Sequence, residues 1–208
     1  MKLICAITIL ASTTACVTGK REIALEIPTS SSAATKSGMI FIASVDDKRV
    51  FVHKPKTPET PSIKGDLESK TPAELSTYIG RQRNGYGRAM GSVALANGST
   101  VPDEVRKLLK AGIEARGYQV VNAATPNAVN LDVDIEKFWA WFVPSFFTMG
   151  FESELELSLQ STSKTAQVRG KGNNEGQVAS NANWALSYKR AYADLLSKLD
   201  KALEELGL

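Results

Sequence analysis

The stretch LDVDIEKFWAWF, residues 131–142, decides the fold. Its first six residues alternate aliphatic with acidic side chains, which is the two-residue period of a strand with one solvated face. The alternation lapses at Phe138-Trp139, where both faces of the strand become apolar. A strand covering 129–142 would extend about 45 Å at ~3.3 Å per residue, against about 17–20 Å for a usual strand. We therefore expect this strand to bend, or to project beyond its sheet.

Four other segments of the domain have the pattern of strands. Leucines alternate with polar residues over 155–160, and a glycine-weakened strand follows at 166–175 after a turn. The apolar run Met39–Val45 suits a central strand, and Tyr118–Val121 forms a short strand after a helix.

Two amphipathic helices accompany these strands. The first begins at Pro102, carries acidic residues in its first turn, where the helix dipole favours them, and ends at Arg116-Gly117. The second has an apolar side marked at helical spacing from Trp184 to Leu206. The order of the elements predicts an α+β fold, in which a mixed or antiparallel sheet of about four strands has two main helices packed on one face.

A long loop insertion is expected at 52–99 within a single domain at 38–208. Three prolines between residues 55 and 61 favour an extended loop, because each removes a donor and restricts the residue before it. Thr71-Pro72-Ala73-Glu74 has the pattern of a short helix with a capping box. Residues 80–91 are rich in glycine and arginine, and a compact domain seldom keeps so long a connection without a use for it.

The first fifteen residues predict a lipoprotein signal peptide. Lys2 gives a positive start, Leu3–Ala11 is a short apolar run, and small residues precede Cys16. The apolar run is shorter than the ~20 residues of a membrane-spanning helix. Residues 16–37 then predict a lipidated N-terminus and tether with a serine-rich, low-complexity part. Within the tether, residues 22–27 alternate with the period of a half-buried strand, which ends at Pro28.

Cys16 is the predicted lipidation site. Thr13-Thr14-Ala15-Cys16 resembles a lipobox, although Thr13 departs from the aliphatic residue preferred there. Cys5 lies in the signal, so Cys16 is the lone cysteine of the mature chain. We expect palmitate-type acylation and a membrane as partner through that lipid. Because Asp does not follow Cys16, the periplasmic face of the outer membrane is favoured over the inner membrane.

Composition limits the function classes. The net charge is +3 and 43% of the residues are hydrophobic, so a core can form and nucleic acid is not expected as a partner. His53, the single histidine, lies beside Lys54 in the proline-rich loop, where a solvated side chain is favoured over a catalytic base. Asp132, Asp134 and Glu136 fit an exposed strand face better than a metal site. We expect no catalytic residues, no metal and no cofactor.

The element order and some residues resemble the YajG-type family of bacterial lipoproteins. The matching parts are the lipidated start, the helix ending Glu114-Ala115-Arg116-Gly117-Tyr118, the strand at Leu131–Ile135 and the C-terminal helix. The resemblance covers roughly residues 38–208, with 52–99 as a larger insertion. It implies a small envelope lipoprotein and carries no catalytic residues to this chain.

Arginines in the glycine-rich segment are candidates for binding an anion or a partner. Arginine binds phosphate and carboxylate groups in a bidentate manner, and glycines leave backbone donors free. A merely flexible, soluble loop is the alternative. We expect exposed side chains at the candidate positions, which are Arg81, Arg83 and Arg88.

An aromatic segment at 138–151 is the second candidate. Two of the three tryptophans and five of the seven phenylalanines fall within it. The segment either folds into the core or forms an apolar interface, for which tryptophan is favoured at membrane surfaces. Within it, the candidate interface residues are Trp139, Trp141, Phe142, Phe146, Phe147 and Met149.

These patterns predict a lipid-anchored, non-enzymatic binding or assembly module of the cell envelope. We expect an envelope protein as its partner, and a homo-oligomer is compatible with the sequence. The alternative is an auxiliary lipoprotein subunit of an envelope or lipid transport system, which would need an open apolar groove between sheet and helices.

Overall fold

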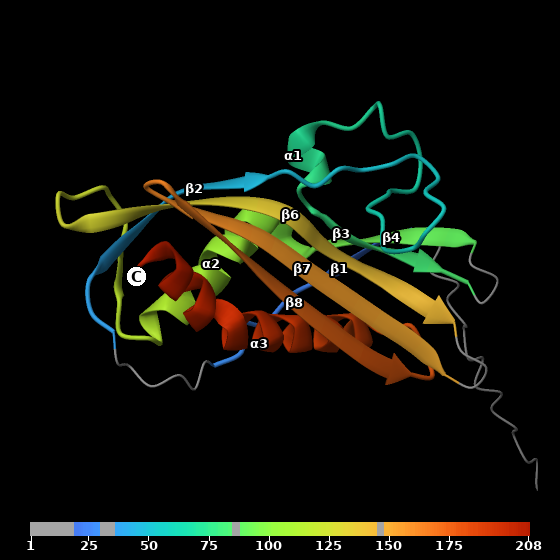
Figure 1. Cartoon of the computed structure of the whole chain (residues 1–208). Helices are drawn as coiled ribbons and strands as arrows, with labels where there is room; N and C mark the ends of the chain where they lie inside the picture. Colours follow the sequence, from blue (N-terminus) through green and yellow to red (C-terminus); the bar gives the residue numbers. More distant parts are fainter. Residues whose placement is uncertain (1–18, 30–35, 85–87, 145–147) are drawn as a thin grey trace, which may run out of the picture.

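The computed structural model describes residues 19–29, 36–84, 88–144 and 148–208 (Figure 1). Within these residues, eight strands form one mixed sheet and three α-helices accompany it. The strands are β1 (Lys20–Ile23), β2 (Met39–Asp47), β3 (Tyr78–Arg83), β4 (Ala89–Leu95), β5 (Gln119–Val121), β6 (Ala128–Pro144), β7 (Met149–Ser161) and β8 (Lys164–Gly176). The helices are α1 (Pro72–Leu75), α2 (Val101–Glu114) and α3 (Asn181–Leu206), with a short 3-10 turn at Ala96–Gly98.

The α+β class is correct, but the prediction of about four strands and two main helices is wrong. The additional strands come from segments that were assigned to an insertion and a tether. β3 and β4 lie inside the predicted insertion, whose turn-rich composition hid them. β1 lies inside the predicted tether and overlaps the strand-like alternation at 22–27.

β6 is the central strand, and the sheet forks along it (Figure 1). One edge of β6 pairs antiparallel with β7, which in turn pairs with β8. The other edge pairs parallel with β2 from Ala128 to Ile135, and then with β3 at Ala140 and Trp141. One branch therefore ends in β5, and the other continues through β4 to β1.

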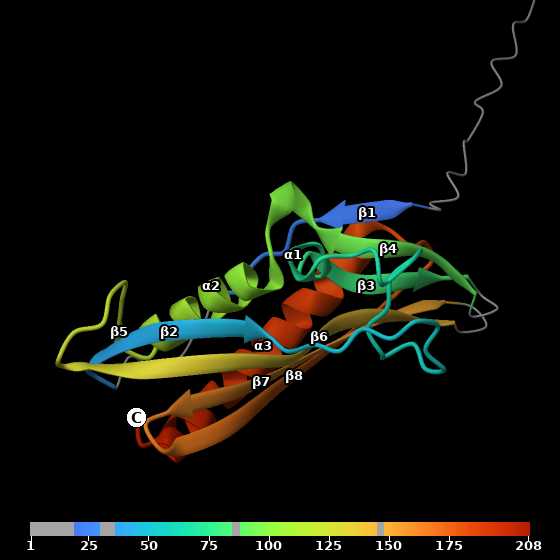
Figure 2. The same ribbon diagram turned by 90° about the horizontal axis from the view of Figure 1, so that it is seen from above.

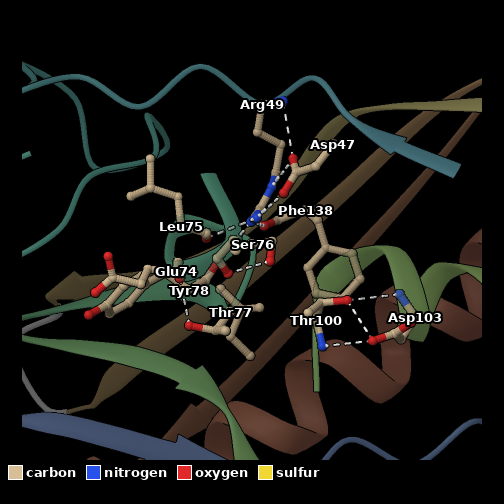
Figure 3. A network of polar contacts seen from close by, with 12 residues as sticks. Asp47, Arg49, Glu74, Leu75, Ser76, Thr77, Tyr78, Thr100, Asp103 and Phe138 are labelled. Atoms are coloured by element: carbon tan, nitrogen blue, oxygen red, sulfur yellow. Dashed lines mark hydrogen bonds and ion pairs between the residues drawn. The ribbon is translucent and has the colours of Figure 1, made fainter. Parts of the chain in front are cut away.

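Arg49 fills the fork between the two branches (Figure 3). Its Nε and Nη2 donate to both carboxylate oxygens of Asp47 at 2.7 and 2.6 Å. Its Nη1 donates to the carbonyls of Tyr78 and Phe138 at 2.7 and 2.9 Å. Phe138 lies in the part of β6 between its pairing with β2 and its pairing with β3. The buried guanidinium thus supplies a donor where the ladder is interrupted.

α2 and α3 cover one face of the sheet, and their apolar sides form the core with it (Figure 2). The ring of Phe138 stacks on that of Tyr188 in α3, with 5.0 Å between the ring centroids. The ring of Phe151 contacts that of Trp184 edge-on, also with 5.0 Å between the centroids. The interface between sheet and helices is filled with fully buried side chains such as Leu157 and Leu199. The described residues between the sheet and the helices thus form a packed core.

A β-bulge in β6 explains the lapse of alternation seen in the sequence. The register with β7 shifts between Ile135 and Lys137, so Glu136 is the extra residue. Before the bulge Ile135 faces the helices, and after it Phe138 does. Trp139 consequently points to the opposite face of the sheet.

The segment after β2 covers that opposite face. Phe51 contacts the Trp139 ring edge-on at 5.8 Å, and Trp139 Nε1 donates to the carbonyl of Pro58 at 3.2 Å. Val52 N donates to Pro61 O at 2.9 Å and closes the loop on itself. The proline-rich stretch is therefore a fixed cover on the sheet.

The Arg116-Gly117-Tyr118 joint fixes the end of α2. Arg116 is buried and donates to Asp200 of α3 at 2.6 and 3.0 Å. Gly117 has φ +101°, and a Cβ there would collide with the carbonyl of Lys36. This turn needs glycine because both its backbone angle and its close neighbour exclude a side chain.

Candidate functional site

A basic pocket of about 260 Å³ lies between the cover segment and the β3–β4 hairpin. Four of its lining side chains are basic, and none of the described residues that line it is acidic. The volume is slightly below the ~300–1,000 Å³ of pockets that enclose whole small ligands. It therefore suits one charged group better than an entire molecule. The lining residues are His53, Lys54, Pro55, Ser62, Ile63, Gly65, Arg81, Arg83 and Ala89.

Arg81 forms the wall of this pocket from inside the sheet. It lies in β3, in register with Ser92 of β4 on one side and Trp141 of β6 on the other. It is only 7% exposed, and its Nε and Nη1 have no hydrogen-bond partner within the described residues. Burial lowers the pKa of Arg81, and the charge of nearby Arg83 lowers it further. A buried cation without a partner is costly, so this side chain favours an anion in the pocket.

The cover segment is held against the sheet at several points around the pocket. Pro58 accepts the indole hydrogen bond of Trp139, and the backbone N of Lys64 donates to Ser92 Oγ at 3.1 Å. Because Ser92 pairs with Arg81, this second contact lies directly beside the pocket. The pocket is therefore formed before any ligand arrives, which limits the ordering cost of binding.

His53 and Lys54 bring basic side chains from the cover segment. Both residues are exposed, and Lys54 adopts the left-handed backbone conformation with φ +51°. Together with Arg81 and Arg83, they place three formal positive charges and an imidazole around one small volume. Guanidinium groups stay protonated at physiological pH, so the arrangement can bind and orient an anion.

The structure separates the three predicted arginines. Arg81 and Arg83 line the pocket, and Arg81 lies in a strand and is buried, so the expected exposed loop position is wrong for it. Arg88 is exposed at the tip of the hairpin, where its backbone N donates to Asn84 Oδ1 at 2.9 Å. Arg88 does not line the pocket, so its replacement can serve as a control for replacements of the pocket arginines.

The predicted apolar interface is divided between core and surface. Trp139 and Phe142 are buried, on the cover side and the helix side respectively, so for these two residues the core alternative holds and the interface alternative is wrong. Trp141 and Met149 are partly exposed. Phe146 and Phe147 lie outside the described residues. The register places Trp141 next to Arg81, so parts of the two predicted sites lie side by side.

Other predicted sites add little. Cys16 lies outside the described residues, and the part of the chain that the structure describes contains no metal-binding cluster of His, Cys, Asp or Glu. None of the described helices is long and apolar enough to cross a bilayer. Sequence reasoning did not connect His53 and Lys54 with the arginines. The sequence feature that could have pointed to them is a pair of basic residues in a proline-rich segment that is too long to be a simple turn.

Comparison with known proteins identifies similar folds only. No family model and no curated protein matches the chain. A crystal structure of protein XCC0632 from Xanthomonas campestris, described as family-model DUF330, is similar over 88% of this chain and 94% of that one, at 12% identity and TM-score 0.48. A second crystal structure, described as an uncharacterized protein, is similar over 89% and 97%, at 9% identity and TM-score 0.45.

Proposed function

We propose that this protein is a lipid-anchored envelope lipoprotein whose basic pocket binds an anionic group of its ligand. The observation that carries the proposal is Arg81, whose buried guanidinium lines a small pocket with two nitrogen atoms left unsatisfied. Native proteins rarely leave such groups without a partner. An anion in the pocket would satisfy the charge of Arg81, and Lys54 and Arg83 lie beside it.

The proposed role is binding, at the periplasmic face of the outer membrane, with no reaction catalysed. Lipid on Cys16 would supply the attachment, and the pocket would supply recognition. Kinship with YajG-type lipoproteins is part of the proposal. It rests on the signal pattern, the Arg116-Gly117-Tyr118 joint, the long strand and the C-terminal helix.

Anion binding is tested by thermal unfolding of the full chain. Inorganic phosphate should raise the unfolding temperature above that in sodium chloride of equal ionic strength, because a ligand that binds only the folded state stabilises it. The rise should shrink in Arg83→Gln and in Arg81→Lys. Arg88→Gln removes the same charge as Arg83→Gln from outside the pocket and should keep the rise. An equal response to both salts in the native protein would contradict the proposal.

The anchor is tested by metabolic palmitate labelling. The native chain should incorporate label and fractionate with membranes. Cys16→Ser should lose both properties, because no other cysteine is expected in the mature chain. An unlabelled mature protein with its N-terminus elsewhere would disprove the anchor and leave the pocket proposal standing.

A further inference from the structure

Four residues in four neighbouring strands lie in register beside the basic pocket. Lys20 of β1 pairs with Ser92 of β4, Ser92 pairs with Arg81 of β3, and Arg81 pairs with Trp141 of β6. Neighbouring strands are ~4.8 Å apart, so Arg81 lies about 10 Å from the first residue of β1. The pocket therefore lies close to the start of β1, where the chain enters the sheet.

That point is also close to the proposed anchor. Lys20 is four residues after Cys16. A chain spans at most ~3.3–3.6 Å per residue, so Lys20 can lie no more than about 14 Å from the acylated cysteine. The polar layer on each side of a bilayer is itself about 5–8 Å thick. A lipid on Cys16 would therefore hold this edge of the sheet against the headgroups.

The same end of the molecule carries the surface that a membrane would meet. β1 and β4 begin at this end, and β3 and β6 end there (Figures 1 and 2). It bears exposed Lys20, partly exposed Trp141 and exposed Val143. Of the carboxylates near this end, Glu22 of β1 forms an ion pair with Lys20 at 2.9 Å, Glu152 of β7 is in register with Trp141, and Glu175 belongs to β8. Basic and aromatic side chains together are typical of a membrane surface contact.

We infer that the basic pocket holds the phosphate of an anionic lipid headgroup from the leaflet that carries the Cys16 anchor. The inference rests on the proposed function, and it adds the source of the anion and the orientation of the domain. The pocket's volume fits one headgroup phosphate, and its wall offers basic side chains from two elements. Acyl chains and a basic contact are the two signals that together make membrane attachment stable.

Hydrogen exchange of the lipidated protein reconstituted in vesicles tests the inference. Three conditions are compared: phosphatidylcholine alone, phosphatidylcholine with phosphatidic acid, and phosphatidylcholine alone with inorganic phosphate in the buffer. With phosphatidic acid, amides of segment 53–63 and of β3 should exchange roughly tenfold more slowly, as for a site occupied ten times more often than empty. Lys54→Gln and Arg83→Gln should lose most of this protection.

Two control variants and the free phosphate separate the outcomes. Arg88→Gln at the same end and Lys201→Gln at the C-terminal end of α3 should keep the protection. If free phosphate protects equally and phosphatidic acid adds nothing, the lipid inference fails and anion binding stands. If neither protects, both fail. If Arg88→Gln loses as much protection as Lys54→Gln, the attraction is a diffuse surface effect and the pocket assignment is overturned.

Discussion

Arg49 is a single residue on which the forked sheet depends. Its guanidinium is fully buried and connects β2, β3 and β6 through Asp47 and two strand carbonyls. Arg49→Ala should cost about 3–5 kcal/mol of unfolding free energy, because it leaves Asp47 and the carbonyls unpaired. Urea denaturation monitored by circular dichroism would measure the loss.

The neighbouring lysine is the control for this prediction. Lys48 is half exposed and approaches Asp46 and Asp134 only at 3.8 Å. Lys48→Ala should change stability by less than about 1 kcal/mol, as exposed ion pairs do. Similar losses in the two variants would show that Arg49 is not the centre of the fork.

Glu154 makes stability depend on pH. It lies on β7, 9% exposed, with Lys137 Nζ at 2.5 Å and Lys171 Nζ at 3.2 Å. Burial alone would raise the pKa of Glu154, but the hydrogen bonds and charges of Lys137 and Lys171 outweigh it and lower the pKa. A carboxylate with a lowered pKa stabilises the fold above its unfolded pKa of ~4.3, and this contribution is lost as pH falls through the folded value.

Urea denaturation across a pH series would detect this contribution. Glu154→Gln should be less stable than the native protein at pH 7, and the difference should shrink below about pH 4. Glu136→Gln, on the exposed bulge, should follow the native curve at every pH. If the unfolding free energy of Glu154→Gln stays below that of the native protein by the same amount down to pH 2, the loss comes from packing and the charge of Glu154 does not cause it.

At the scale of elements, α3 both packs on β8 and shields its free edge. Gly172 lets the helix approach closely, since a Cβ there would collide with the carbonyl of Ser187. Among the described strands β8 pairs only with β7, so its outer edge offers unpaired backbone groups. Three side chains of α3 take them: Lys198 donates to Arg169 O, Asp194 accepts from Lys171 N, and Arg190 donates to Asn173 O.

Removing these side chains should open the edge of β8 to other chains. The triple variant Arg190→Ala, Asp194→Ala, Lys198→Ala should self-associate, because an unprotected long edge strand is a template for pairing. Light scattering of the native and variant proteins in detergent would show it. The control is a triple replacement at exposed α3 positions that make no hydrogen bond to the β8 backbone, Lys189→Ala, Lys201→Ala and Glu205→Ala, and it should remain as monodisperse as the native protein. Equal behaviour of both triple variants would contradict the shielding role.

At the scale of the whole molecule, β1 makes residues 20–23 part of the domain. Ile23 is 2% exposed and belongs to the core, and the chain pairs with β4 from Lys20 to Ile23. Deleting residues 19–27 should lower the unfolding temperature by several degrees, since a fully buried aliphatic side chain and a strand are lost. Gly19→Ala, where a Cβ would meet nothing within 4 Å, is the control. An unchanged unfolding temperature after the deletion would mean that this segment is only a tether and does not stabilise the domain.

The sequence alone determined the elements whose signals are local. Caps and periodicity predicted α1, α2 and α3, and alternation predicted β6 and β7, because these patterns reflect which face of an element is buried. An apolar run predicted β2, and strands were also predicted at β5 and β8. Thr71 and Glu74 form the predicted capping box. Arg81, Arg83 and Arg88 were singled out together as candidate anion-binding residues, because clustered charge is visible without a fold.

Only the tertiary structure decided which face and which neighbour each residue has. One extra residue, Glu136, turns Trp139 to the cover side, whereas unbroken alternation would place it on the same face as Ile135. The pocket joins Lys54 to Arg81 across 27 positions of sequence. β3 and β4 were missed because short strands gain their stability from partners distant in the chain. Contacts of this kind depend on register and chain crossing, which local hydrophobic patterns do not encode.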